Sequence, residues 1–274
     1  MGLFDWLIRK KVSFPLEDSS LEDFLPRIQT LARPAWHLRK TDQSTFSRLG
    51  GQPLAPPRFE WPMWNERPLP FLAQLNLTEA KSADSLLPQS GCLYFFFDQE
   101  AEDQEEFGAW RVIHHEEAFA DMAAVTPPGG LGRKSIFSEV PLAFKNITSY
   151  PAWDETCLVS LKLNQAQWNS YAELGGSCYD DKPLHQLGGW AQPVQNSNME
   201  IECQQARALR DETEILQGDE LEKAAQEWML LFQLDTDEAA KMMWGDGGML
   251  YFWIRKEDLR SRNFAEVWMI MQYC

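Results

Sequence analysis

Two stretches of the chain, far apart in the sequence, repeat the same order of short motifs. Each contains a Gln-Leu-Asn or Gln-Leu-Asp segment, then a Gly-x-Leu-Tyr segment that continues with aromatic residues, then a segment that starts with tryptophan. The segments are residues 71–77, 91–97 and 110–113 in the first stretch, and residues 230–235, 248–254 and 268–271 in the second. A Leu-Gly-Gly precedes each set, at 49–51 and at 187–189. This internal repeat predicts a duplicated three-strand β-unit.

The repeat and the segments around it predict an α+β fold. We expect the duplicated three-strand β-units to form a pseudo-twofold sheet core with peripheral helices. No linker rich in Pro, Gly or Ser separates the two stretches, so residues 1–274 are predicted to form a single domain. Within it we distinguish four parts, which are an N-terminal helical segment (1–45), a first β-unit (46–115), an insert (116–184) and a second β-unit (185–274).

The hydrophobic pattern differs between the predicted strands. Residues 93–97 and 250–254 are apolar on both faces, which is typical of central strands that are covered on both sides. The first strand of each unit alternates instead. In the first unit, alternation places Phe71, Ala73, Leu75 and Leu77 on one face, and Leu72, Gln74 and Asn76 on the other.

Other segments have helical or strand patterns. A capped helix is expected near 21–31, and further helices at 165–174, 199–216 and 219–228, whereas 140–147 and 156–163 are predicted to be strands. Residues 3–11 can form a short amphipathic helix, which either packs on the body or contacts a membrane surface.

The net charge of −16 argues against nucleic acid or an anionic membrane as the main partner. It fits either a soluble protein or one that meets a basic protein. Part of the negative charge lies in the acidic tract 99–106, which is expected to be a solvated loop.

No apolar run is long enough to span a membrane. The five cysteines form no Cys-x-x-Cys, which favours reduced thiols and a cytoplasmic location.

No catalytic motif is present, so an enzyme is the less favoured class. Adjacent His114 and His115 would point to opposite faces of a strand, so they cannot chelate one metal ion together. No metal site and no cofactor are predicted.

Six residues are candidates for ligand binding. His185 and Trp190 flank the flexible Gly188-Gly189 pair, and Trp244 and Asp246 belong to a Trp-Gly-Asp-Gly-Gly sequence that could instead be a tight turn. The third pair consists of Gln74 and Gln233, which add polar groups to otherwise apolar strands. These two side chains either face a ligand or are buried amides that bond to loop backbone.

Several of these motifs together resemble the bacterial YwqG-like family. They are Arg48-Leu-Gly-Gly-Gln-Pro53, Trp61-Pro62, the two Gln-Leu-Asn/Asp segments, His185-Gln-Leu-Gly-Gly189, Trp244-Gly-Asp246 and the run 250–254. The resemblance covers roughly residues 45–274 in order and implies a mixed α and β structure with no catalytic residues to transfer. Some relatives lie beside secreted-toxin genes, which suggests an immunity or protein-binding role.

The expected function is therefore that of a cytoplasmic binding protein, an immunity-type partner of a basic protein such as a nuclease toxin. The alternative is a small-molecule-binding protein or enzyme, with its site near the Gly-Gly-Trp and Trp-Gly-Asp loops.

Overall fold

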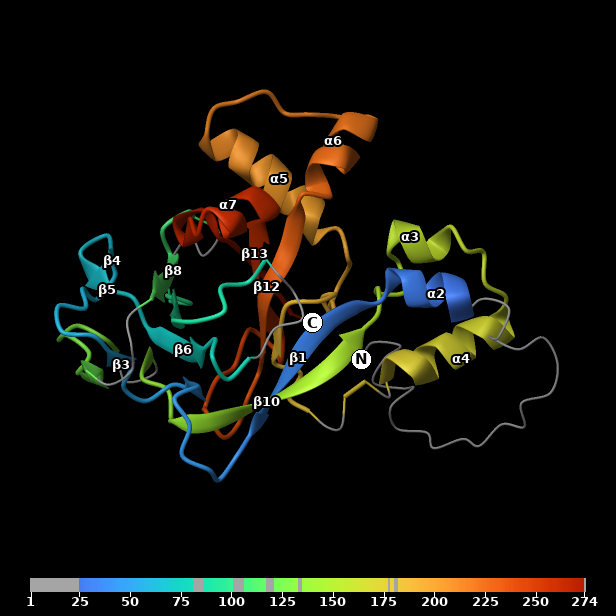
Figure 1. The fold of residues 1–274 in the computed structure, drawn as a ribbon. Coiled ribbons are helices and arrows are strands. Elements are labelled where there is room, and N and C mark those ends of the chain that lie inside the picture. Colours follow the sequence, from blue (N-terminus) through green and yellow to red (C-terminus); the bar gives the residue numbers. More distant parts are fainter. Residues whose placement is uncertain are drawn as a thin grey trace.

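A large antiparallel sheet dominates the computed structural model of the protein (Figure 1). Within the residues that the structure describes, ten strands are hydrogen-bonded in the order β14-β13-β12-β11-β1-β10-β2-β6-β7-β8. Their bounds are β1 Arg33–Lys40, β2 Arg48–Leu49, β6 Phe71–Asn76, β7 Cys92–Phe97, β8 Trp110–His115, β10 Val140–Ser149, β11 Gln186–Leu187, β12 Trp228–Asp235, β13 Met249–Arg255 and β14 Trp268–Gln272. Two small two-stranded sheets accompany the large one, namely β3 (Leu54–Ala55) with β9 (Ala123–Ala124) and β4 (Met63–Trp64) with β5 (Arg67–Pro68).

The described residues are 25–80, 86–100, 106–116, 121–132, 135–176, 178–179 and 182–273. The helix expected at 3–11 and residues 101–105 of the acidic tract lie outside them. The α+β class is confirmed, and the two strands expected to be central, β7 and β13, are buried except for Arg255 at the end of β13.

Both ends of the sheet follow the same sequence of pairings. One end runs β2-β6-β7-β8 and the other runs β11-β12-β13-β14, and β10 and β1 join them in the middle. In the two matching strand pairs, Gln74 lies opposite Tyr94, and Gln233 lies opposite Tyr251.

A β-bulge interrupts the alternation of β6 and of β12. The register shifts between Phe71 and Ala73 in the first strand, and between Leu230 and Phe232 in the second. The bulged residue is a leucine two positions before the glutamine in both cases. Since a bulge inserts one extra residue, the alternation reverses on its far side. The prediction that Phe71 shares a face with Ala73 is therefore wrong, because Phe71 packs in a separate cluster with Tyr94 and Phe96.

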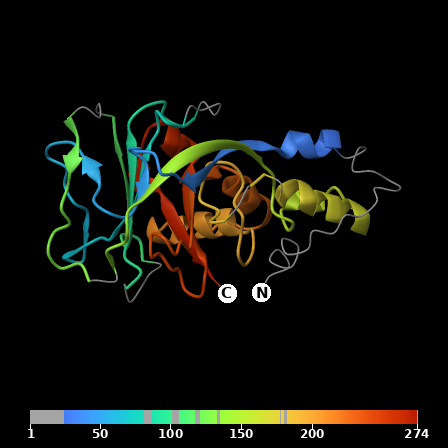
Figure 2. The same ribbon diagram turned by 90° about the horizontal axis from the view of Figure 1, so that it is seen from below.

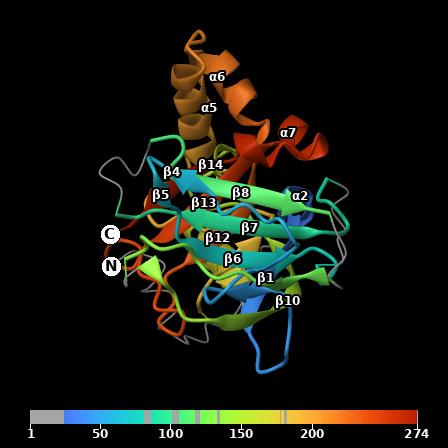
Figure 3. The same cartoon turned by 90° about the vertical axis from the view of Figure 1, so that its left-hand side faces the viewer.

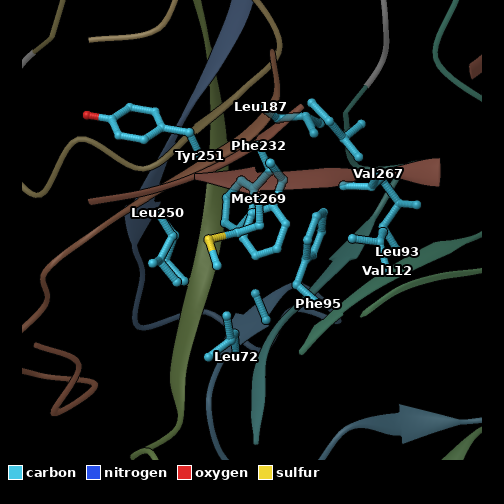
Figure 4. Close-up of a cluster of buried hydrophobic side chains, with 14 of the residues drawn as sticks. Leu72, Leu93, Phe95, Val112, Leu187, Phe232, Leu250, Tyr251, Val267 and Met269 are labelled. Atoms are coloured by element: carbon cyan, nitrogen blue, oxygen red, sulfur yellow. The ribbon is translucent and has the colours of Figure 1, made fainter. Parts of the chain in front are cut away.

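The main core fills the space between the two halves of the sheet. The ring of Phe95 from β7 lies 4.6 Å from the ring of Phe232 and 5.1 Å from that of Phe252, measured between centroids. Figure 4 shows Phe95 and Phe232 pointing into one cluster with Leu72, Leu187 and Met269. Aromatic and aliphatic side chains of both halves thus bury one continuous apolar interior.

The two end strands approach each other, so the sheet is nearly closed. The indole Nε1 of Trp110 on β8 donates a hydrogen bond to the carbonyl of Val267, next to β14, at 2.8 Å. The rings of Trp110 and Trp268 meet edge to face at 5.3 Å.

Helices surround the sheet in two groups. At one end, α2 (Leu25–Leu31), α3 (Thr156–Val159) and α4 (Gln165–Gly176) enclose a small core of their own (Figure 2). Near β12 to β14 lie α5 (Met199–Arg210), α6 (Gly218–Ala225), α7 (Lys256–Arg260) and the 3₁₀ helix η4 (Phe264–Glu266) (Figure 3). Among the described residues, no helix has both the length and the apolar character needed to cross a bilayer.

Two predictions from local pattern need correction. The strand expected at 156–163 is wrong, because residues 156–159 form the short helix α3 and the chain then turns without forming a strand. The helix expected to continue to 216 ends at Arg210, where the chain soon takes a left-handed turn at Glu212. Short apolar runs do not by themselves distinguish a strand from a helix.

We expect the contact between Phe95 and Phe252 to be a major source of stability. Each side chain is fully buried, so Phe95→Ala or Phe252→Ala should lower the free energy of unfolding by about 3–5 kcal/mol. Because the two rings touch, the double variant should deviate from additivity by about 0.5–1.5 kcal/mol. Urea denaturation measures both quantities. Leu209→Ala, at a side chain that is 65 % exposed, is the control and should change stability by less than about 0.5 kcal/mol. Additive losses would show that the halves do not share a core here.

Candidate functional site

The two Gly-Gly pairs make the same kind of turn. All four glycines have positive φ, between 52° at Gly50 and 77° at Gly189, a region that side chains disfavour. A Cβ at Gly189 would also collide with the side chain of Ser149. The amide of Gly50 donates to the carbonyl of Leu72 at 2.8 Å, and the amide of Gly188 donates to that of Leu231 at 3.0 Å. Each Gly-Gly turn is thus anchored on the bulged residue of the neighbouring strand.

A glutamine and a tyrosine then hold the chain three residues after each Gly-Gly pair. In the first half, the amide oxygen of Gln74 accepts a hydrogen bond from the backbone N–H of Leu54, and the hydroxyl of Tyr94 donates to the Leu54 carbonyl, both at 2.7 Å. In the second half, Gln233 and Tyr251 bond in the same way to the backbone of Gln192, both at 2.8 Å. Figure 4 shows the Tyr251 hydroxyl directed away from the apolar cluster. We call this arrangement the Gln–Tyr clamp.

The clamp accounts for the two buried glutamines. Their side-chain oxygens are bonded to loop backbone, as the buried-amide interpretation expects. The side-chain nitrogens of the two glutamines differ in their hydrogen bonds. Nε2 of Gln233 donates to the carbonyl of Leu184 at 2.8 Å, whereas the buried Nε2 of Gln74 has no hydrogen-bond partner.

His185 is a buried bridge between strand and turn. Its ring nitrogen Nδ1 accepts a hydrogen bond from the backbone N–H of Asp235 at 3.1 Å, so the proton of the neutral ring lies on Nε2, which is 3.2 Å from Oδ2 of Asp237. Burial acts to raise the pKa of Asp237, but the hydrogen bonds from His185 and from the Ala240 amide outweigh it and hold that pKa below its usual value.

Trp244 and Asp246 lie in a turn before β13. Trp244 is fully buried, packs against Phe97 and Phe137, and donates its indole N–H to the carbonyl of Asp235 at 3.3 Å. Asp246 is exposed between two glycines of positive φ. Trp244 therefore belongs to the interior, and the sequence around Asp246 has the geometry of a tight turn.

Trp190 lines a cavity of about 480 Å³. The cavity lies where α2, the start of α3, α5, α6 and the loop after β11 come together. The Trp190 indole is fixed from two sides, since its Nε1 donates to the carbonyl of Leu31 at 2.6 Å and the guanidinium carbon of Arg33 lies 3.4 Å from its ring centroid. Of the six candidates, Trp190 alone is among the residues that line this cavity.

Four acidic residues also line this cavity, namely Asp154, Glu155, Glu200 and Glu222. Burial, together with repulsion from Glu200, raises the pKa of Glu155 to about 8 although Arg33 opposes the shift. Burial likewise raises the pKa of Glu200 to about 7. One oxygen of Asp154 accepts the amide of Ser197 at 3.1 Å, and its other oxygen is buried without a hydrogen-bond partner. We call these residues, with Trp190, the acidic cavity.

The sequence analysis did not find the acidic residues of this cavity. Asp154 and Glu155 come just before α3 and before the segment 156–163 that was predicted to be a strand, and Glu200 lies in the first turn of α5. The signal in the sequence was the Gly-Gly-Trp motif, which located Trp190 and one wall of the cavity only.

A family model matches residues 47–274 of the chain, under the description "Domain of unknown function (DUF1963)". The chain belongs to the DUF1963 family. A search among curated proteins finds no relative that matches it.

The DUF1963 match includes both Gly-Gly turns, both Gln–Tyr clamps and the acidic residues of the cavity, whereas Leu31 and Arg33 lie before it. In the described part of this DUF1963 chain, no group of three or more His, Cys, Asp or Glu side chains is arranged to hold a metal ion. Closely spaced and partly dehydrated carboxyl groups are relieved of their mutual repulsion when a cation arrives.

The two clamps predict unequal costs of mutation. Gln233→Leu leaves both the Gln192 amide and the Leu184 carbonyl unpaired, whereas Gln74→Leu leaves only the Leu54 amide unpaired. Since each buried group left without a partner costs about 1–3 kcal/mol, Gln233→Leu should be the more destabilising of the two in urea denaturation. Gln52→Leu, at an exposed glutamine, is the control. Equal losses for Gln74→Leu and Gln233→Leu would contradict this account of the clamps.

The raised carboxyl pKa values predict how stability varies with pH. Between about pH 4.5 and pH 8 the folded protein keeps protons on Glu155 and Glu200 that the unfolded chain releases, so these groups make stability fall as pH rises. The variant Glu155→Gln/Glu200→Gln lacks this loss. It should match the parent near pH 4.5 and exceed it at pH 9 by about 1–3 kcal/mol, because partial exposure to water reduces the full effect. Urea denaturation at both pH values measures the difference, and a constant offset would contradict the assignment.

Proposed function

We propose that this protein is a non-catalytic binding protein, and that its acidic cavity receives a cationic side chain, lysine or arginine, of a basic partner protein. The observation that carries the proposal is the convergence of Asp154, Glu155 and Glu200 on one cavity beside the ring of Trp190. Lys256 also lines the cavity, but its ammonium group donates to the carbonyl of Gln226 at 2.7 Å. With Arg33 and Lys256 as its basic lining residues, the cavity holds four acidic side chains and two basic ones.

A cation suits this cavity for two physical reasons. It would offset the repulsion between Glu155 and Glu200, so that both carboxyl groups ionise and release protons. The indole of Trp190 also offers a face that attracts cations, which the position of Arg33 over that ring illustrates. Affinity should accordingly rise with pH as these carboxyl groups lose their protons.

An exposed tryptophan next to a lining residue of the cavity favours a protein as the partner. Trp153 precedes Asp154 in the chain and is 54 % exposed, and exposed tryptophans are enriched in protein interfaces. The resemblance to the YwqG-like family, some members of which lie beside secreted-toxin genes, supports an immunity-type role in the cytoplasm. A nuclease toxin would supply the basic surface.

The first experiment uses small probes. N-acetyl-arginine amide and N-acetyl-lysine amide are titrated into the protein by calorimetry at pH 6 and pH 8.5, with N-acetyl-glutamine amide as the neutral probe. We expect saturable binding of a cationic probe that is tighter at pH 8.5, and at least about tenfold weaker binding by Glu155→Gln/Glu200→Gln. Glu238→Gln, at an exposed acid in another turn, is the matched control and should bind like the parent. Absence of binding at pH 8.5, or an equal loss in the control, would contradict the proposal.

The second experiment separates the cavity from the acidic tract once a basic partner has been captured from the native host. One variant carries Gln at 155 and 200, and the other carries Gln or Asn at the acids 100, 102, 103, 105 and 106. The cavity proposal expects the first variant to dissociate faster from the partner and the second to change mainly the association rate. If only the tract variant weakens the complex, the partner binds the tract and not the cavity.

A small-molecule-binding role is the second candidate, because a cavity of about 480 Å³ lies in the range that holds small ligands. Micromolar affinity for one of the free cationic probes would favour this role, or an enzyme built around the same loops, over a protein partner.

We further propose that the two halves derive from a duplicated unit with pseudo-twofold symmetry. The matching strand orders, the bulges at Leu72 and Leu231, the two Gly-Gly turns and the two Gln–Tyr clamps support this. Superposition of residues 71–113 on residues 230–271 should bring Gln74 onto Gln233 and Tyr94 onto Tyr251. A mismatch at these positions would contradict it.

A further inference from the structure

A second hollow, distinct from the acidic cavity, lies on the other half of the molecule. It is an open groove of about 600 Å³, lined among others by Arg58, Trp61, Met63, Arg111 and His115. These residues come from the segment around β4 and from β8, which lie beside each other in Figure 3. We propose that this groove, which we call the arginine groove, binds a small aromatic oxyanion, a ligand with a flat ring and one phosphate or carboxylate group.

The two arginines of the groove are the first observation. Several other arginines pair with carboxylates, as Arg48 does with Glu139 at 3.0 Å and Arg67 with Asp98 at 3.1 Å. Among the described residues, Arg58 and Arg111 form no ion pair. In a chain with 41 acidic and 25 basic residues, this groove brings together two guanidinium groups that are not in an ion pair with a described residue. Guanidinium groups bind oxyanions through paired hydrogen bonds.

The apolar wall of the groove is the second observation. The Trp61 ring is held in place, since its Nε1 donates to the carbonyl of Leu69 at 2.9 Å and its ring contacts that of Phe96 at 5.4 Å. Met63 is 49 % exposed, and the half-buried Ile113 continues the apolar surface. A fixed indole beside an exposed methionine offers a preformed surface for a flat ring.

Two further residues limit the class of ligand. Glu60 also lines the groove, and its carboxylate, together with the net charge of −16, disfavours an extended polyanion such as nucleic acid. Arg58 has a φ of +78°, an unusual backbone conformation for a residue with a side chain. Such conformations occur often where a side chain is held for binding. A ligand with a single oxyanion group therefore fits best.

The test titrates phenyl phosphate and benzoate into the full chain by calorimetry, with inorganic phosphate and phenol as partial probes. We expect at least one of the two aromatic oxyanions to bind saturably and more tightly than either partial probe. Tighter binding of phenyl phosphate would identify a phosphate ligand, and tighter binding of benzoate a carboxylate ligand. Failure of both aromatic probes to bind at 10 mM, which is roughly the weakest affinity that two such contacts should give, would overturn the proposal. Equal binding of inorganic phosphate and phenyl phosphate would overturn the role of the apolar wall.

Variants locate the site. Arg58→Ala and Arg111→Ala should each weaken binding by about tenfold, and Met63→Glu, which places a negative charge at an exposed position of the groove, should abolish it. Arg260→Ala, at an exposed arginine of α7, is the matched control and should bind like the parent. Melting temperature and near-ultraviolet circular dichroism verify that the variants fold. If the folded Arg58→Ala and Arg111→Ala proteins bind like the control, the proposal is wrong.

Discussion

The Gln–Tyr clamp is the interaction on which the arrangement of loops depends. The strands β2 and β11 contain only two residues each, too few to hold their place in a large sheet by ladder hydrogen bonds alone. Beyond each of them the chain turns at a Gly-Gly pair, and Gln74 with Tyr94, or Gln233 with Tyr251, captures the backbone three residues later. Burial raises the pKa of both tyrosines, which keeps their hydroxyl groups protonated as donors.

The position of the acidic cavity follows from the second clamp. Trp190 stands between the Gly-Gly turn and the clamped residue Gln192, so its backbone has little freedom. Its ring then packs under Arg33 and bonds to the carbonyl of Leu31 at the end of α2. The first half has an equivalent clamp, but there the captured residue Leu54 starts the small strand β3. The same device thus supports a cavity in one half and a strand pair in the other.

The sequence was informative where periodicity and burial agree. It predicted the buried strands β7 and β13 and the helix α4, because long apolar or periodic runs have few structural solutions. For Gln74 and Gln233 it left two interpretations open, of which the structure has the buried amide. It did not predict the bulges at Leu72 and Leu231, since a bulge depends on pairing with the neighbouring strand. The sequence did not predict the acidic cavity for a similar reason. Glu155 and Glu200 are separated by 45 positions in the sequence, and they come together only because the segment before α3 bonds to the segment before α5, through Asp154 and Ser197.

The charge that a ligand would meet in each hollow depends on the ion pairs nearby more than on the net charge of the chain. At −16 the chain as a whole repels anions, yet Arg58 and Arg111 are in no ion pair with a described residue, whereas Glu139 and Asp98 pair with other arginines. In the acidic cavity the balance is the reverse, since its lining holds four acidic side chains and, as basic ones, Arg33 and Lys256. Screening at physiological salt confines each local field to about 8 Å, so hollows on different halves of the molecule can act independently. Opposite ligand charges at the two sites are therefore compatible with a single acidic chain.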